Sequence, residues 1–179
     1  ALVRHNYEVN KKFRVLNKIV TWYVNIIRGT PVILQLMIIY YVIFKSVNIN
    51  IVIVSILAFG INSGAYVSEI IRAGINSIPI GQSEAGYALG FKYGEVMKLI
   101  VLPQAIKNIL PALGNEFVTL IKETSVGAYI GVVELTKASD IIASRTYDYF
   151  FPLIMIACIY LVITLGLTNL VNKMEVKLS

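Results

Sequence analysis

Long apolar stretches, separated by short polar ones, run along most of the chain. No charged residue stands between Asp148 and Lys173, and the segment 150–171 exceeds the ~20 residues that a helix needs to cross a bilayer. A second uncharged stretch, between Lys45 and Glu69, also has spanning length and predicts a helix over 49–72. The pattern therefore predicts an all-α protein whose helices cross a membrane.

A third apolar stretch, 31–45, is short. The sequence Arg28-Gly-Thr-Pro31 separates it from another apolar segment, 19–27. Proline suits the first turn of a helix, and the long side chain of Arg28 can carry its charge toward water while its stem stays among apolar groups. We therefore expect a helix that restarts at Pro31 and a third span over 31–45.

The fourth span, 96–121, differs from the others because polar residues and prolines interrupt it, namely Pro103, Asn108, Pro111, Asn115, Glu116 and Thr119. Lipid does not satisfy such groups, whereas neighbouring protein or a water-filled cavity does. We therefore expect this helix to lie inside a bundle of the other spans.

The distribution of Lys and Arg predicts how the spans are oriented, because cytoplasmic loops are enriched in these residues. It assigns 1–28, read as a loop, and 172–179 to the cytoplasm. Four crossings connect these two ends, so that 72–98 is also cytoplasmic and 123–148 lies outside. We expect one transmembrane domain over 1–179.

Composition supports a membrane protein and leaves little material for catalysis. Hydrophobic residues make up 57% of the chain, and its mean hydropathy is +0.74. The net charge of +6 comes from basic residues scattered between apolar stretches, which does not favour binding to nucleic acid. One cysteine, Cys158, and one histidine, His5, exclude an intrachain disulfide and a Cys- or His-rich metal site. We expect no enzymatic activity, no catalytic residues, no metal and no cofactor in this chain.

A motif begins in the segment expected in the cytoplasm after the span 49–72 and extends into the start of the span 96–121. Glu84-Ala85-Gly86 is followed four residues later by a glycine and, after nine more residues, by Ile-x-Leu-Pro; its positions include Gly81, Glu84, Ala85, Gly86, Gly90, Leu102 and Pro103. Ser83 or Gly81 can cap a helix, Glu84 in its first turn interacts favourably with the positive end of the helix dipole, and Gly90 can end it. We expect a short helix over 79–90, with Ser83 or Gly81 as its cap and Gly90 as its end.

This motif resembles the EAA loop of the permease subunits of ATP-binding-cassette (ABC) importers, with Gly86 where the family favours a second alanine. The resemblance implies a type I importer fold in which 79–90 is a coupling helix that docks in a groove of an ATPase subunit. Docking of a helix in a groove is a common mode of recognition. The glycine is expected to weaken the helix slightly without disabling it.

Four further segments resemble one branch of that family, the polar amino acid uptake permeases of the histidine, glutamine, arginine and cystine type; they are 23–31, 64–72, 102–105 and 120–125. In that branch the Arg-Gly-Thr-Pro stretch opens the second of five helices. The resemblance therefore implies four spans here, with a fifth, N-terminal one missing.

The resemblance also implies the partners of the chain. They are an ABC ATPase, an extracytoplasmic amino-acid-binding protein, a second copy or a paralogue of the permease, and the lipid of a bacterial cytoplasmic membrane. The sequence contains no Gly-x-x-x-x-Gly-Lys-Ser/Thr phosphate-binding loop, so ATP and Mg²⁺ are expected on the partner ATPase.

Two polar stripes are candidates for lining a substrate path. Helical spacing aligns Asn62, Tyr66 and Glu69 on one span; on another it aligns Asn108, Asn115, Thr119 and Lys122, with Glu116 beside them. Such groups offer acceptors for an ammonium and donors for a carboxylate. Two simpler explanations stay open, because Glu69 can pair with Arg72 three residues on and Lys122 can extend toward water.

A second class of function also explains polar, proline-broken helices, since a fragment of an ion-gradient-driven secondary transporter contains them too. The two classes differ in coupling, because such a transporter works without ATP and needs no docking helix. An intramembrane enzyme is disfavoured, since no second carboxylate stands in register with Glu116.

Overall fold

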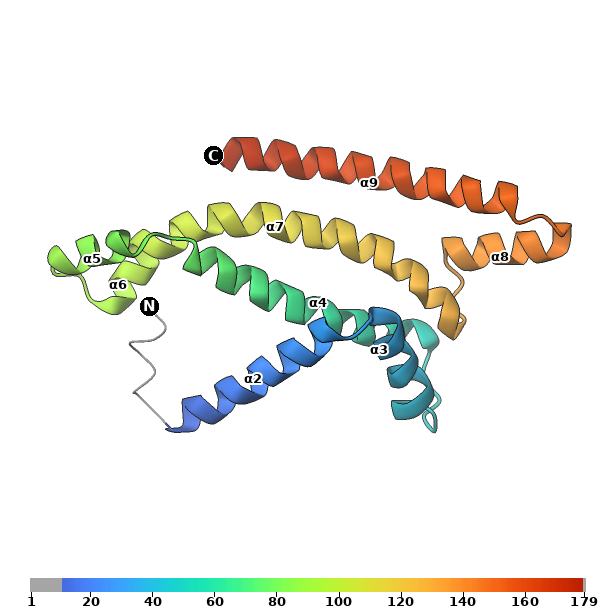
Figure 1. Ribbon diagram of the computed structural model, residues 1–179, viewed down its shortest axis with the longest axis horizontal. Helices are drawn as coiled ribbons and strands as arrows, with labels where there is room; N and C mark the ends of the chain where they lie inside the picture. The colour runs from blue at the N-terminus through green and yellow to red at the C-terminus, as the bar shows by residue number, and fades with distance from the viewer. Residues whose placement is uncertain (1–10, 179) are drawn as a thin grey trace.

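The computed structural model describes residues 11–178, which form a helical bundle without any strand in that range (Figure 1). Its elements are α2 (Lys11–Gly29), α3 (Val32–Ile38), the π-helical turn η2 (Ile39–Ile43), α4 (Ile51–Asn76), α5 (Ile80–Ala88), α6 (Tyr93–Val96), the π-helical turn η3 (Met97–Val101), α7 (Leu102–Glu123), the 3₁₀ segment η4 (Thr124–Ile130), α8 (Leu135–Thr146) and α9 (Phe150–Leu178). The all-α fold class is thus confirmed.

Three helical stretches are long and apolar enough to cross a membrane: Ile51–Asn76, Tyr93–Ile130 and Phe150–Val176. They contain most of the predicted segment 49–72 and all of 96–121 and 150–171. A fourth crossing exists only if Arg14–Gly29 and Val32–Ile43 count as one span, and these two helices meet at an angle of 109°. The segment 31–45 therefore contains the second helix of a sharply bent pair of helices.

The loop expected over 1–28 is wrong from Lys11 onward, where α2 begins; residues 1–10 lie outside the described part of the chain. Apolar residues at 15, 19, 22, 23 and 26 follow helical spacing, and neither proline nor glycine occurs before Gly29. Lys and Arg are also good helix formers. The basic composition of this segment is typical of a cytoplasmic loop, whereas its periodicity indicates a helix.

The helix α4 lies in the middle of the bundle, with α2 and α3 packed against it on one side and α7 on another, and α9 packs on α7 (Figure 1). A Cβ atom at Gly114 would lie 2.7 Å from a methyl carbon of Val171, so the glycine permits the close approach of α7 and α9. The helix α7 thus packs between α4 and α9, as expected of a span among others, but Asn108 and Asn115 of its polar stripe are exposed, so that enclosure inside a bundle stays a prediction.

The elements divide between the two ends of the bundle. The start of α2, the α5–α6 segment and the end of α9 lie toward one end, and η4 and α8 lie toward the other (Figure 1). This division agrees with the predicted alternation of segments between two sides, and which side is cytoplasmic stays a prediction. The outer surface of α9 is apolar, with exposed side chains such as Val162 and Leu161, as expected for contact with lipid.

Candidate functional site

The helix α5 begins differently from the prediction. Its N-cap is Pro79, whose backbone is extended, and its first residue is Ile80. No side chain caps it; Ser83 is buried and its hydroxyl lacks a partner within the described residues. Capping by Ser83 or Gly81 and the first-turn position of Glu84 are therefore wrong. The proline explains the earlier start, because it fixes φ at a value suited to entering a helix and its missing N–H costs nothing there.

The end of α5 confirms the prediction that Gly90 stops the helix. Gly90 has φ of +85°, a conformation that glycine adopts without steric cost. The N–H of Phe91 donates to the carbonyl of Gly86 at 3.1 Å, and the N–H of Gly90 donates to the carbonyl of Tyr87 at 2.9 Å. These two bonds form a Schellman motif, which satisfies the last carbonyls of the helix.

Gly86 is the contact point between α5 and the next helical segment. It is buried, and a Cβ atom there would lie 2.7 Å from Cδ1 of Ile100 and 2.9 Å from Cγ2 of Val96. Val96 is fully buried, and its segment α6 is capped by Glu95, whose carboxylate accepts from the N–H of Lys92 at 2.7 Å. The glycine is therefore a packing feature, and neither of its partners was predicted from the sequence. We call this contact the glycine joint.

The two halves of the motif occupy different surfaces. Glu84 and Ala85 are exposed on α5, together with apolar side chains at Ile80, Tyr87 and Leu89, of which Leu89 is 76% exposed. A short helix that presents carboxylate and apolar groups to water offers a surface for docking.

Leu102 and Pro103 lie instead at the start of α7, directly after the π-helical turn η3. Proline has no N–H for the usual helical bond, and here the N–H of Leu102 bonds back to the carbonyl of Met97. The glycine joint packs α5 onto this turn. The glycine joint therefore connects α5 to the start of α7, which lies between α4 and α9.

A polar network closes the sharp bend between α2 and α3. The amide nitrogen of Gln35 lies 2.7 Å from the carbonyl oxygen of Ile27, 2.9 Å from that of Thr30 and 2.8 Å from the Thr30 hydroxyl. Its amide oxygen accepts from Asn62 of α4 at 2.9 Å. Asn62 is 2% exposed, and its own amide oxygen has no partner among the described residues. We call this network the polar knot.

Gln35 was not singled out from the sequence, although a lone amide in an apolar stretch just after Arg-Gly-Thr-Pro was a usable signal. The predicted role of Asn62 in lining a path conflicts with its burial between α3 and α4. Its side chain orients Gln35, whose N–H groups satisfy carbonyls that the helix break leaves without helical partners.

Glu69 is held by two arginines. It forms a two-pronged ion pair with Arg72, one bond of which is 2.9 Å long, and Arg28 lies 3.7 Å away. The guanidinium of Arg28 also lies over the ring of Tyr66, 5.3 Å from its centre. Of the two explanations for Glu69, the structure therefore contains the ion pair. Its charge is already compensated, which weakens it as a receptor for an ammonium group.

Part of the polar stripe of α7 forms hydrogen bonds with α4 and its C-terminal end, and part of it is exposed. The hydroxyl of Ser63 donates to Glu116 at 3.2 Å, and the amide of Asn108 donates to Ser77 at 2.8 Å. Asn115 and Lys122 are exposed, and Glu116 and Thr119 are half-buried. Within residues 11–178, no hydrogen bond or ion pair joins this stripe to Asn62, Tyr66 or Glu69.

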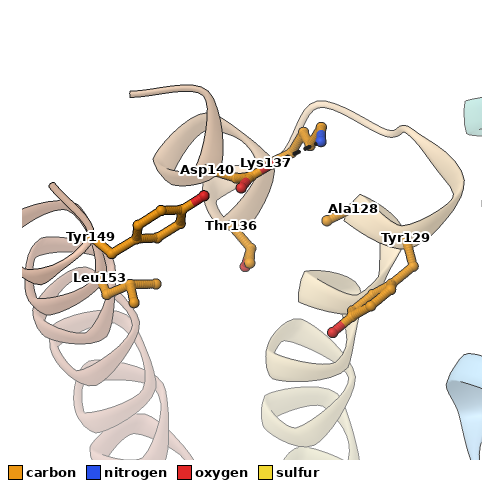
Figure 2. Close-up of a pocket in the computed structure, with 7 residues that line it drawn as sticks. All are labelled: Ala128, Tyr129, Thr136, Lys137, Asp140, Tyr149 and Leu153. Atoms are coloured by element: carbon orange, nitrogen blue, oxygen red, sulfur yellow. Dashed lines mark hydrogen bonds and ion pairs between the residues drawn. The ribbon is translucent and has the colours of Figure 1, made fainter. Parts of the chain in front are cut away.

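A pocket of about 450 Å³ opens at the opposite end of the bundle from α5, between η4, α8 and α9 (Figure 2). Its lining residues are Ala128, Tyr129, Thr136, Lys137, Asp140, Tyr149 and Leu153. Lys137 and Asp140 form an ion pair of 2.9 Å, so their charges balance each other. In the part of the chain that the structure describes, no three His, Cys, Asp or Glu side chains are placed to hold a metal ion.

Comparisons with known proteins agree with this geometry. The sequence profile of the family described as "Binding-protein-dependent transport system inner membrane component" matches residues 7–178. A putative glutamine transport system permease protein of Rickettsia prowazekii is 43% identical over 96% of this chain and 79% of its own length. The arginine transport system permease protein ArtQ of Bacillus subtilis is 44% identical over 93% of this chain and 77% of its own length.

Solved structures share the fold. The crystal structure of an amino acid ABC transporter with histidines superposes with a TM-score of 0.87 at 41% identity, covering 98% of this chain and 81% of that one. The MetNI methionine ABC transporter superposes with a TM-score of 0.72 at 19% identity, covering 94% and 76%, which supports the fold alone.

Proposed function

The chain belongs to the family of binding-protein-dependent transport system inner membrane components, the permease subunits of ABC importers, and from this we infer that its cargo is a polar amino acid. The relative named for glutamine and the one named for arginine are more than 40% identical to it. A permease named for cystine, from Bacillus subtilis, is 39% identical over 94% of this chain. The likeness at 41% identity to a solved amino acid ABC transporter is the observation that carries the inference. The ion-gradient alternative has no counterpart among these relatives.

We further propose that the exposed face of α5 is the docking site for a separate ATPase subunit. Glu84, Ala85 and Leu89 lie on that face. The chain has no phosphate-binding loop, so ATP and Mg²⁺ belong to the partner, and the permease itself hydrolyses nothing. An extracytoplasmic binding protein and a second permease, a copy or a paralogue, complete the importer in a bacterial cytoplasmic membrane.

The coupling step follows from how α5 is attached. Because Gly86 has no side chain, α5 packs directly against Val96 and Ile100. A movement of α5 on ATP binding therefore moves η3 and the start of α7 with it. The stripe of Asn115, Glu116, Thr119 and Lys122 on α7 then changes its exposure. We propose that this stripe lines the substrate path, because it combines donors and acceptors suited to a zwitterion with positions in a span that packs between α4 and α9.

Uptake and co-purification with a candidate ATPase and binding protein test this function. Glu84→Lys and Gly90→Asp are expected to abolish ATPase association and amino-acid uptake while the permease still inserts into membranes. Glu175→Lys is the matched control, since it reverses the same charge at an exposed position outside α5. Uptake that persists in the two α5 variants, or without ATP, would overturn the ABC assignment.

A further inference from the structure

The helix α2 carries positive charge without any negative charge. It contains five basic residues and no acidic one. The charge at its C-terminal end is compensated, because Arg28 lies over Tyr66 and near Glu69. Arg14 and Lys18, in its N-terminal half, are exposed and form no ion pair with any other described residue. The two ends of one helix therefore present very different electrostatic surfaces.

The uncompensated end also presents an apolar surface. Val15 and Ile19 are 57% and 60% exposed. Trp22, the only tryptophan of the chain, is 73% exposed. Arg14, Lys18 and Trp22 follow each other at intervals of four residues, which places them along one side of the helix.

The N-terminal half of α2 stands apart from the rest of the bundle. Contact with α4 is made further along, where the hydroxyl of Tyr23 donates to the carbonyl of Ile61. Toward its start, α2 diverges from α4 (Figure 1). Neighbouring elements of the described chain therefore do not cover the cationic and apolar side chains of this half.

We propose that anionic phospholipid of the cytoplasmic leaflet binds along this half of α2, with its phosphate groups at Arg14 and Lys18 and its acyl chains against Val15, Ile19 and Trp22. Basic side chains near a membrane surface attract anionic headgroups, and their stems rest against the apolar layer. Tryptophan favours the boundary between headgroups and acyl chains.

Two other occupants fit less well. A second copy that docked here through a twofold contact would bring the same cations of both copies together, which is repulsive. A soluble phosphate ion would leave the apolar side chains uncovered, whereas a lipid covers both kinds of group. The proposal does not depend on the cargo or on the ATPase.

Trp22 provides the test, because all tryptophan fluorescence of the chain comes from it. The purified full chain is reconstituted into vesicles in which brominated phosphatidylglycerol or brominated phosphatidylcholine replaces increasing shares of the lipid. Quenching then reports the relative binding of the two lipids at α2. We expect phosphatidylglycerol to bind about ten- to thirty-fold more strongly, given two cations near the surface. The preference should fall toward one at about 1 M KCl, where the Debye length is about 3 Å.

Variants separate charge from packing. In the double variant Arg14→Gln and Lys18→Gln, the preference should disappear while quenching by phosphatidylcholine stays unchanged, which also shows that α2 keeps its environment. Arg14→Lys with Lys18→Arg should retain the preference. Lys98→Gln with Lys107→Gln, which removes two exposed cations outside α2, is the matched control and should also retain it.

Three results would overturn the proposal. The first is equal quenching of the unaltered chain by both lipids, and the second is a preference that survives the loss of both cations. The third is a Trp22 that neither lipid quenches, since protein would then cover this face of α2.

Discussion

Two joints of this protein are held together by opposite kinds of interaction. The bend between α2 and α3, which lies between apolar helices, is closed by the polar knot of Gln35, Thr30 and Asn62. The contact between α5 and η3, which lies in a segment expected in the cytoplasm, is closed by apolar side chains packed on Gly86. Polar contacts thus hold the joint with apolar surroundings, and apolar contacts hold the joint near water.

Solvation explains this inversion. Where a helix breaks among apolar neighbours, no water replaces the lost backbone bonds, so side chains must supply the donors. Where a loop lies in water, the solvent satisfies the backbone, and burial of Val96 and Ile100 gives the segment a fixed shape. The first joint is therefore sensitive to the loss of donors, and the second to changes of volume.

The largest expected effect is that of Gln35→Leu. This change removes the donors to Ile27 and Thr30 and leaves Asn62 without its acceptor. Asn62 is buried, the contact with Ile27 is part-buried and Thr30 is exposed, and each unsatisfied buried group costs about 1–3 kcal/mol, so we expect a loss of about 2–4 kcal/mol in unfolding free energy. Unfolding in mixed detergent micelles measures it.

Gln82→Leu is the control for that prediction, because Gln82 is exposed and, among residues 11–178, its side chain accepts one long hydrogen bond, 3.4 Å from Gln104. It should change stability by less than about 0.5 kcal/mol. If the two leucine variants were equally stable, the polar knot would not be what holds the bend. In the Gln35→Leu background, Asn62→Leu should cost less than in the unaltered chain, because the pair acts as one network.

An intermediate effect is expected for Gly86→Val, which tests the other joint. The new side chain must displace Ile100 and Val96, and overpacking of this kind costs about 1–3 kcal/mol. ATPase association should weaken with it, because α5 tilts away from η3. Melting temperature and co-purification measure the two effects.

We expect the loss of stability to come from the lack of space for the valine side chain, and not from the helix propensity of valine. Ile100→Ala should therefore restore part of the stability of the Gly86→Val chain. Ala85→Val, at the exposed neighbouring position, is the matched control and should leave the melting temperature nearly unchanged. Equal losses at both positions would show that valine simply disfavours the helix.

The smallest effect is expected for Tyr23→Phe. This change removes the bond from the Tyr23 hydroxyl to the carbonyl of Ile61, close to the polar knot but at an exposed site. The carbonyl of Ile61 lies within α4 and keeps its helical bond from the N–H four residues on, so we expect a loss of about 0.5–1 kcal/mol. The same unfolding assay measures it. A loss as large as that of Gln35→Leu would mean that burial does not decide how much a polar contact contributes.

Local pattern was enough to predict several elements. The uncharged stretches that became α4 and α9 were evident because spanning length and apolar composition are properties of consecutive residues. Gly90 was identified as a helix end for a similar reason, since a positive φ is a local requirement. The α2 helix was missed although its periodicity was present, because its basic composition was interpreted as a loop.

The contacts that define the two joints were not predictable in the same way. Nothing near Gly86 in the sequence indicates that Val96 and Ile100 fold back onto it, and nothing near Asn62 points to Gln35, 27 residues earlier. The predicted stripe of Asn62, Tyr66 and Glu69 was regular in spacing, yet each of these side chains meets a partner: Gln35 for Asn62, and Arg28 for both Tyr66 and Glu69.

The sequence by itself determined that this protein is a bundle of membrane-crossing helices with a short helix in the loop between two of them, and its motif pointed to an importer permease. Only the tertiary structure decided which polar residues close a bend, which glycine forms a joint and which cations remain uncompensated. Helix length and hydropathy depend on residues adjacent in the chain, whereas hydrogen-bond partners, available volume and charge compensation depend on side chains brought together by packing.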